Sequence, residues 1–137
     1  MRPRNRMVLY VRPQATKEAR QNILEEWYRE QIKCEVPQLL AKWEPILDVK
    51  SGRCFVRRMK TKWGSCNPAS CSIMLNTDLA KKPPQCLEYI LVHEMIHLRE
   101  PTHNTRFIAL MDAYIPKWRS YRQLLNQFPV RHEKRIY

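Results

Sequence analysis

The sequence PPQCLEYILVHEMIHLR, residues 83–99, is the most informative part of this chain. Proline is well tolerated in the first turn of a helix, and the residues that follow are apolar on nearly every side of a helical path. A helix with this pattern runs through the core of a protein rather than along its surface. We therefore predict a central core helix over residues 83–99, ended or bent by Pro101.

This helix carries an H-E-x-x-H pattern at His93, Glu94 and His97. Residues four apart project from one helix face, so both imidazoles can bind the same metal ion while Glu94 reaches a water on that ion. The alternative is a pair of core histidines satisfied by hydrogen bonds. The apolar context favours the metal, because three ionisable groups without partners would be costly to bury.

A catalytic zinc ion takes three protein ligands and keeps one position for water. His103 follows His97 by six residues, so the chain can turn back and offer a third imidazole, although a surface histidine is the alternative. No glutamate occurs between Glu100 and Glu133, and Asp112 is a weak substitute. The sequence therefore predicts zinc at His93, His97 and His103.

The chemistry follows from these ligands. Zinc held by three histidines lowers the pKa of its water to about 7 and polarises the bond that is attacked. Glu94 would take the proton from this water and pass it to the leaving group. Candidates for orienting the imidazoles or stabilising the developing oxyanion are Glu100, Asn104, Asp112, Tyr114 and Arg122.

The rest of the chain predicts an α+β fold. Long helix formers begin at Thr16, Pro37 should kink or restart this helix, and a second segment over residues 38–43 should stop at Pro45. Short β-rich runs predict strands, and apolar periodicity predicts two further helices. The expected strands are residues 46–49, 54–59 and 71–75, with residues 63–66 on or beside one of them and residues 7–11 as a possible edge strand; the expected helices are residues 104–114 and 117–127.

We thus expect a compact domain, in which a small, mostly antiparallel sheet of three or four strands packs on several helices. The 137 residues suit a single metallohydrolase domain over residues 1–137, with a short N-terminal segment over residues 1–13 and a frayed tail over residues 131–137. No apolar run is long enough for a membrane span or resembles a signal peptide, so we expect a cytoplasmic protein. Five irregularly spaced cysteines do not suggest a disulfide framework.

The chain is strongly basic. It has 25 Lys and Arg against 13 Asp and Glu, a formal net charge of +12. Such a charge attracts polyanions, including nucleic acid and nucleotides, although a solvated face is the plain alternative. A cluster without an intervening acid comprises Arg53, Arg57, Arg58, Lys60 and Lys62.

Taken together, several of these motifs resemble one known family. The segment K-W-G-S-C at residues 62–66, the H-E-x-x-H-L segment at residues 93–98, Glu100, and H-N-x-x-F at residues 103–107 are similar to the YgjP-like metallopeptidase domain, which is related to SprT-type proteins. The resemblance covers residues 25–129. It implies a zincin-like α/β domain with zinc at the three histidines, Glu94 as acid and base, and the W-G-S-C segment beside the cleft.

The resemblance implies a peptide or protein substrate, and it also raises an alternative. Similar proteins have been assigned nucleotide pyrophosphatase activity, especially toward UTP, which the basic cluster would suit. A third hypothesis is a nucleic-acid-associated module with structural zinc. The presence of Glu94 between the ligands disfavours this hypothesis. Family members often carry a β-rich portion before the helix that starts here near Thr16, and only residues 7–11 occupy that place.

Overall fold

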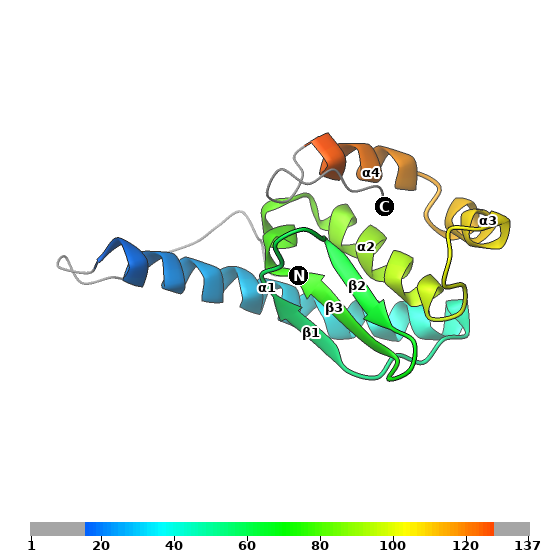
Figure 1. The fold of residues 1–137 in the computed structure, drawn as a ribbon, viewed down its shortest axis with the longest axis horizontal. Helices are drawn as coiled ribbons and strands as arrows, with labels where there is room; N and C mark the ends of the chain where they lie inside the picture. The colour runs from blue at the N-terminus through cyan, green and yellow to red at the C-terminus, as the bar shows by residue number, and fades with distance from the viewer. Residues whose placement is uncertain (1–15, 128–137) are drawn as a thin grey trace.

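The computed structural model describes residues 16–127, so the predictions for residues 7–11, for the N-terminal segment and for the tail over residues 131–137 lie outside the described residues. The first element is α1, Lys17–Leu47, a helix of 31 residues whose beginning extends away from the rest of the fold (Figure 1). Thr16 caps it, because its hydroxyl accepts a hydrogen bond from the backbone N–H of Ala19 at 3.0 Å.

Two prolines lie inside α1, and the predicted end of the helix at Pro45 was wrong. The helix neither breaks at Pro37 nor stops at Pro45, and residues 46–49 form its end and the following turn instead of a strand. Each proline removes a backbone donor, but buried side chains on both sides of the prolines hold the helix against the core. These side chains are Val36, Trp43 and Leu47.

Three strands form one sheet: β1, Cys54–Arg57; β2, Gly64–Asn67; and β3, Ser72–Asn76. Their order is β1-β3-β2, with β2 antiparallel to β3 and β1 parallel to it. The expected antiparallel pairing therefore holds only between β2 and β3, which a short turn joins. After β1 the chain crosses to the far edge of the sheet and forms β2. It then turns back and forms β3 in the middle of the sheet, parallel to β1.

Four further elements complete the described part: η1, Thr77–Lys81; α2, Pro84–His97; α3, Thr105–Tyr114; and α4, Trp118–Gln127. The three α-helices among them confirm the predicted helices to within two residues at each end. The central helix is α2, which contacts β2 and β3 as well as α1, α3 and α4 (Figure 1). All its residues from Cys86 to Ile96 are buried except Glu88.

The predicted α+β class and the H-E-x-x-H core helix are thus confirmed. Helix α2 packs against β2 and β3, α1 packs against β1, and the sheet residues Val56, Ile73 and Leu75 are buried in the core. In the segment from residue 16 to residue 127, no helix is both long and apolar enough to cross a membrane. All five cysteines lie in this segment, and all are free thiols.

Candidate metal centre

Three of the predicted site residues lie on the last turns of α2. His93 and Glu94 are almost completely buried, with 2% and 3% of their surfaces exposed, and His97 is half-buried at the helix end. The spacing of four residues brings the two imidazoles onto one face, with ring centroids 4.6 Å apart. The helix therefore presents both rings to the same point in space.

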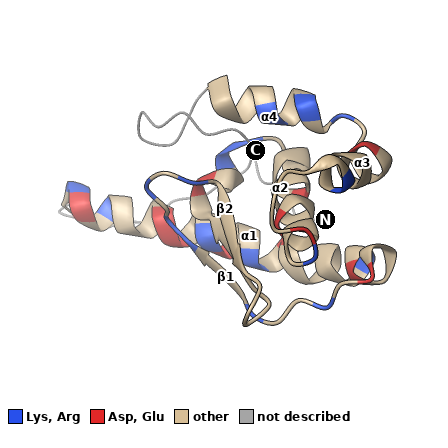
Figure 2. Cartoon of the chain, turned by 45° about the vertical axis from the view of Figure 1, so that its right-hand side comes forward, with Lys and Arg blue, Asp and Glu red and all other residues tan. Residues whose placement is uncertain are grey.

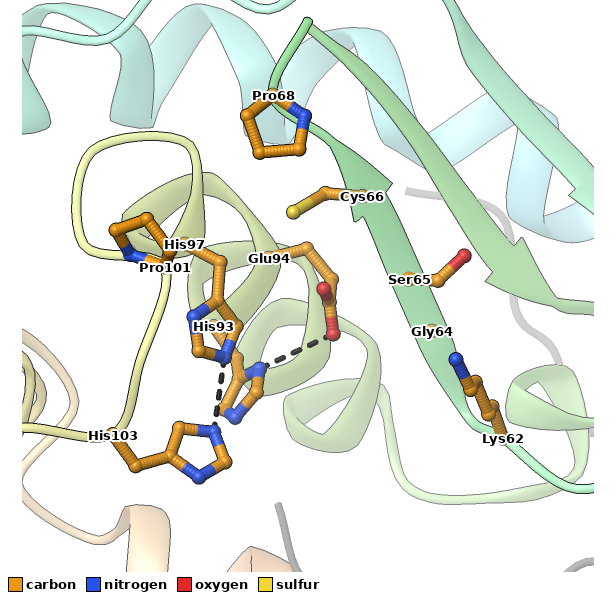
Figure 3. Close-up of a pocket in the computed structure, with 10 residues that line it drawn as sticks. All are labelled: Lys62, Gly64, Ser65, Cys66, Pro68, His93, Glu94, His97, Pro101 and His103. Carbon is orange, nitrogen blue, oxygen red and sulfur yellow. Dashed lines mark hydrogen bonds and ion pairs between the residues drawn. The ribbon is translucent and has the colours of Figure 1, made fainter.

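His103 joins them from the loop after α2. The backbone N–H of Glu100 donates to the carbonyl of Ile96 at 2.8 Å, which closes the last turn before the chain reverses. His103 then meets the helix, and its Nε2 lies 2.9 Å from Nε2 of His97. One side-chain nitrogen from each of the three histidines lies within 4.8 Å of the other two (Figure 3).

The main chain of Glu100 fixes the orientation of His97. Nδ1 of His97 lies 2.9 Å from the Glu100 carbonyl oxygen, and a carbonyl can only accept, so Nδ1 carries the proton. Nε2 then presents its lone pair toward His103 and His93. This is how a histidine is usually held when it binds a metal, with the second nitrogen donating to a carbonyl.

Burial also favours the neutral form of His97 and His103. It lowers the pKa of His97 and that of His103 below the usual value for histidine, and the neighbouring His93 lowers both further. Neutral imidazoles are the form that binds a metal ion. The electrostatics of the cluster therefore suit ligands at neutral pH.

The apolar ring of Phe107 packs against the imidazole rings of all three histidines. It stacks on His97 with a centroid distance of 4.5 Å, and it also contacts His93 at 5.0 Å and His103 at 4.9 Å. Asn104 places it, because the Asn104 side chain caps α3 and accepts from the Phe107 N–H at 2.8 Å. The H-N-x-x-F spacing signals this arrangement, but sequence reasoning assigned Phe107 no role in the site.

The side chain of Glu94 extends from α2 toward strand β2. Its Oε2 is 3.2 Å from Nδ1 of His93. The backbone of Gly64 packs so closely against α2 that a Cβ there would lie 3.3 Å from Cγ of Glu94 and 2.7 Å from Cγ2 of Ile90. The glycine of the W-G-S-C segment thus lets the strand approach the predicted base.

We predict that Gly64→Ala destabilises the protein by about 1–3 kcal/mol, because the added methyl overpacks the contact with Ile90. Urea unfolding of metal-free protein measures this change. Gly52→Ala is no suitable control, since a Cβ there meets the Ser70 carbonyl at 2.9 Å. The exposed Ala69→Gly, in the turn after β2, is the matched change, and an equal loss of stability in both would contradict the packing argument.

A cleft of about 450 Å³ opens over these groups. One wall is formed by the H-E-x-x-H residues and His103, and the other by β2 with the residues at its two ends (Figure 3). The residues of that second wall are Lys62, Gly64, Ser65, Cys66 and Pro68. Among residues 16–127, β2 is an edge strand of the sheet, so the cleft lies beside a sheet edge.

Other residues considered from sequence lie elsewhere. Asp112 accepts from Nε1 of Trp118 at 2.8 Å and from Arg119 at 2.6 Å, which hold the pKa of its carboxyl below the usual range. Neither Tyr114 nor Arg122 lines the cleft. Trp63 is buried in the core at 2% exposure.

The donor set fits a zinc ion. Two nitrogens bound to one tetrahedral zinc at 2.0–2.1 Å lie about 3.3 Å apart. The Nε2 atoms of His97 and His103 are 2.9 Å apart, and one nitrogen from each of the three histidines lies within 4.8 Å of the others. Small side-chain movements would bring these distances to that spacing. Three imidazoles beside an open cleft also leave room for the water that a catalytic site requires.

The family model described as YgjP-like, metallopeptidase domain, matches residues 1–128. No curated protein sequence matches the chain significantly.

Two solved structures share the fold. The metallopeptidase zymogen abylysin of Pyrococcus abyssi is similar with a TM-score of 0.60 and 21% identity, over 65% of this chain and 90% of that one. The metallopeptidase zymogen jannalysin of Methanocaldococcus jannaschii is similar with a TM-score of 0.52 and 22% identity, over 69% of this chain and 97% of that one. At these identities the likeness establishes the fold alone, and it agrees with the zincin-like architecture expected from the sequence.

Proposed function

Because the chain belongs to the family of YgjP-like metallopeptidase domains, we propose that it is a zinc-dependent metallopeptidase. The observation that carries the proposal is the meeting of three imidazole nitrogens beside a buried glutamate in an open cleft. His93, His97 and His103 are the proposed ligands, and Glu94 is the proposed general base. A zinc ion in this site would supply Lewis acidity toward the substrate carbonyl and toward water.

Within this proposal Glu94 moves the protons. It follows the first ligand directly in α2, and its carboxylate faces the cleft opposite β2 (Figure 3). The carboxylate would accept a proton from the attacking water and donate it to the departing amine. Packing of Glu94 against Gly64 limits the movement of its side chain, so the accepting oxygen is held beside the histidines.

The edge strand supports a peptide substrate. In the part of the chain that the structure describes, β2 pairs with β3 alone, so backbone groups on its other edge are available for pairing. An extended peptide could add to this edge as a further strand, which would lay its backbone across the histidine cluster. The cleft is open rather than enclosed, which also suits an extended chain.

The alternative, nucleotide pyrophosphatase activity, draws support from Lys62, whose side chain lines the cleft. The rest of the basic cluster does not contribute there, since Arg53, Arg57, Arg58 and Lys60 are exposed outside the cleft. Figure 2 shows basic residues along the connection between β1 and β2. One lysine is a weak match for a triphosphate, so this arrangement favours the peptidase.

Zinc-loaded protein offered casein and UTP in parallel tests the proposal. We expect new peptide termini, detected by mass spectrometry, and no pyrophosphate release above that of a chelator-treated sample. The chelator-treated sample controls for contaminating activities that need no metal. Release of pyrophosphate from UTP with casein left intact would replace the peptidase by the nucleotide hydrolase.

A further inference from the structure

Lys62 lies at one end of the cleft wall that β2 forms. Its side chain lines the cleft, and it comes two residues before Gly64, where this wall packs against Glu94. In the close-up view, Glu94 appears between Lys62 and the three histidines (Figure 3). The cleft therefore contains a basic side chain beside the groups that we propose to perform the chemistry.

The backbone at Lys62 is held by a buried side chain. Asn76, the last residue of β3, is fully buried, and its Nδ2 donates to the carbonyl oxygens of Lys62 at 2.7 Å and of Met59 at 3.1 Å. The backbone N–H of Asn76 donates to the carbonyl of Trp63 at 3.0 Å, and the Trp63 side chain lies in the core. The fold thus fixes the point from which the lysine extends, while the side chain itself is exposed in the cleft.

The charge of Lys62 is available to a ligand. Among residues 16–127, the ion pairs involve other basic residues, and the acidic residue that lines the cleft, Glu94, pairs with His93. The other four residues of the basic cluster lie outside the cleft. A single cation suits a single carboxylate, and the peptide substrates proposed above can supply one.

The spacing along β2 limits where that carboxylate would lie in a substrate. Successive residues of a strand rise by about 3.3 Å, so Lys62 and Gly64 are about 7 Å apart along it. A peptide added to the edge of β2 has the same rise. If its scissile bond lies beside Glu94, the substrate residue next to Lys62 is within about two residues of that bond.

We propose that Lys62 is a specificity-determining residue, whose ammonium group binds a substrate carboxylate close to the scissile bond. This inference rests on the proposed peptidase function and names the class of peptide that the cleft prefers. Two sources offer this chemistry, namely an acidic side chain and the carboxylate at the C-terminus of the substrate.

Cleavage of matched peptides by the zinc-loaded protein tests the preference. Peptides of one casein sequence carry Glu or Gln at a single position, which is moved along the peptide, and a second set ends at that position with a free carboxylate or an amide. We expect the carboxylate form to be preferred about five-fold in kcat/KM, the upper range for an exposed ion pair. The set that shows the preference identifies the source of the carboxylate.

Variants assign the preference to this lysine. Lys62→Met should make kcat/KM nearly equal for the charged and neutral peptides, and Lys62→Glu should favour the neutral one. Lys60→Glu makes the same charge change at an exposed position outside the cleft, so it is the matched control and should keep the preference of the parent protein. If Lys62→Met keeps that preference, or if Lys60→Glu alters it as much as Lys62→Glu does, the role of Lys62 is wrong.

A binding measurement separates this inference from the function beneath it. The same peptides, labelled with fluorescein, are titrated with zinc-loaded Glu94→Gln, with and without Lys62→Met, and Kd is obtained from the anisotropy. If the parent protein cleaves no peptide while Lys62→Met still removes a preference for the carboxylate, the peptidase proposal fails and carboxylate binding by Lys62 is supported. If peptides are cleaved but neither Kd nor kcat/KM depends on Lys62, the peptidase proposal stands and this inference is overturned.

Discussion

Replacement of His97 by alanine is expected to weaken zinc binding by on the order of a thousand-fold and to abolish turnover. The estimate assigns one of three ligands about a third of a zinc-binding free energy of about 10–16 kcal/mol. His97 is the ligand candidate whose geometry is most fully determined, since the Glu100 carbonyl fixes its tautomer and Phe107 stacks on its ring. Competition with a chromophoric chelator measures the affinity directly.

Thermal unfolding provides an independent measurement. A ligand that binds only the folded state raises the unfolding temperature, so saturating zinc should raise Tm of the parent protein and leave His97→Ala almost unchanged. Glu100→Ala is the matched control, because Glu100 contacts His97 through its main-chain carbonyl, which alanine retains. Equal zinc-induced shifts in the parent protein and His97→Ala would show that the metal is held elsewhere.

The contrast between α1 and α2 shows what a sequence can predict about this fold. Helix α2 was predicted well because nearly all its side chains are buried. Its apolar composition and its position in the core therefore both indicate the same structure, a core helix. Helix α1 was not, because Pro37 and Pro45 oppose a helix locally while tertiary packing of Trp43 and Leu47 supports it. At these prolines the local conformational preference and the tertiary packing favour different structures, and the packing cannot be predicted from a local sequence pattern.

The sheet was harder to predict for the same reason. Residues 54–57 and 72–76 have the apolar and β-branched composition of strands, but residues 64–67 are Gly-Ser-Cys-Asn, which is not a strand-forming composition. They form β2 because the hairpin places them beside β3 and because Gly64 can approach α2 closely. The parallel pairing of β1 and β3 also depends on a path through the far edge that no local pattern encodes.

The candidate site was more predictable than the sheet. His93, Glu94 and His97 needed only the helical repeat, and His103 needed only a reversal of the chain after α2. The parts that were not predicted come from outside these segments. The packing of Phe107 against the three imidazoles depends on how α3 packs against α2.

Replacement of Glu94 by glutamine should separate metal binding from catalysis. Glutamine has nearly the same shape, so it preserves the contact with Gly64, and it leaves the three histidines in place. It cannot accept a proton from water at neutral pH. We expect the variant to bind one zinc per chain as the parent protein does and to lose about a thousand-fold in kcat, within the usual range for loss of a general base.

The assay pairs zinc content, measured by atomic absorption, with cleavage of one peptide at saturating concentration. Glu88→Gln is the matched control on the same helix, because Glu88 binds Trp43 and Lys42 on the other side of α2 and does not line the cleft. That variant should keep both zinc and kcat. If Glu94→Gln retains zinc and full turnover, another group is the base. If it loses zinc as well as activity, Glu94 contributes to holding the metal, and the division between three ligands and one base is wrong.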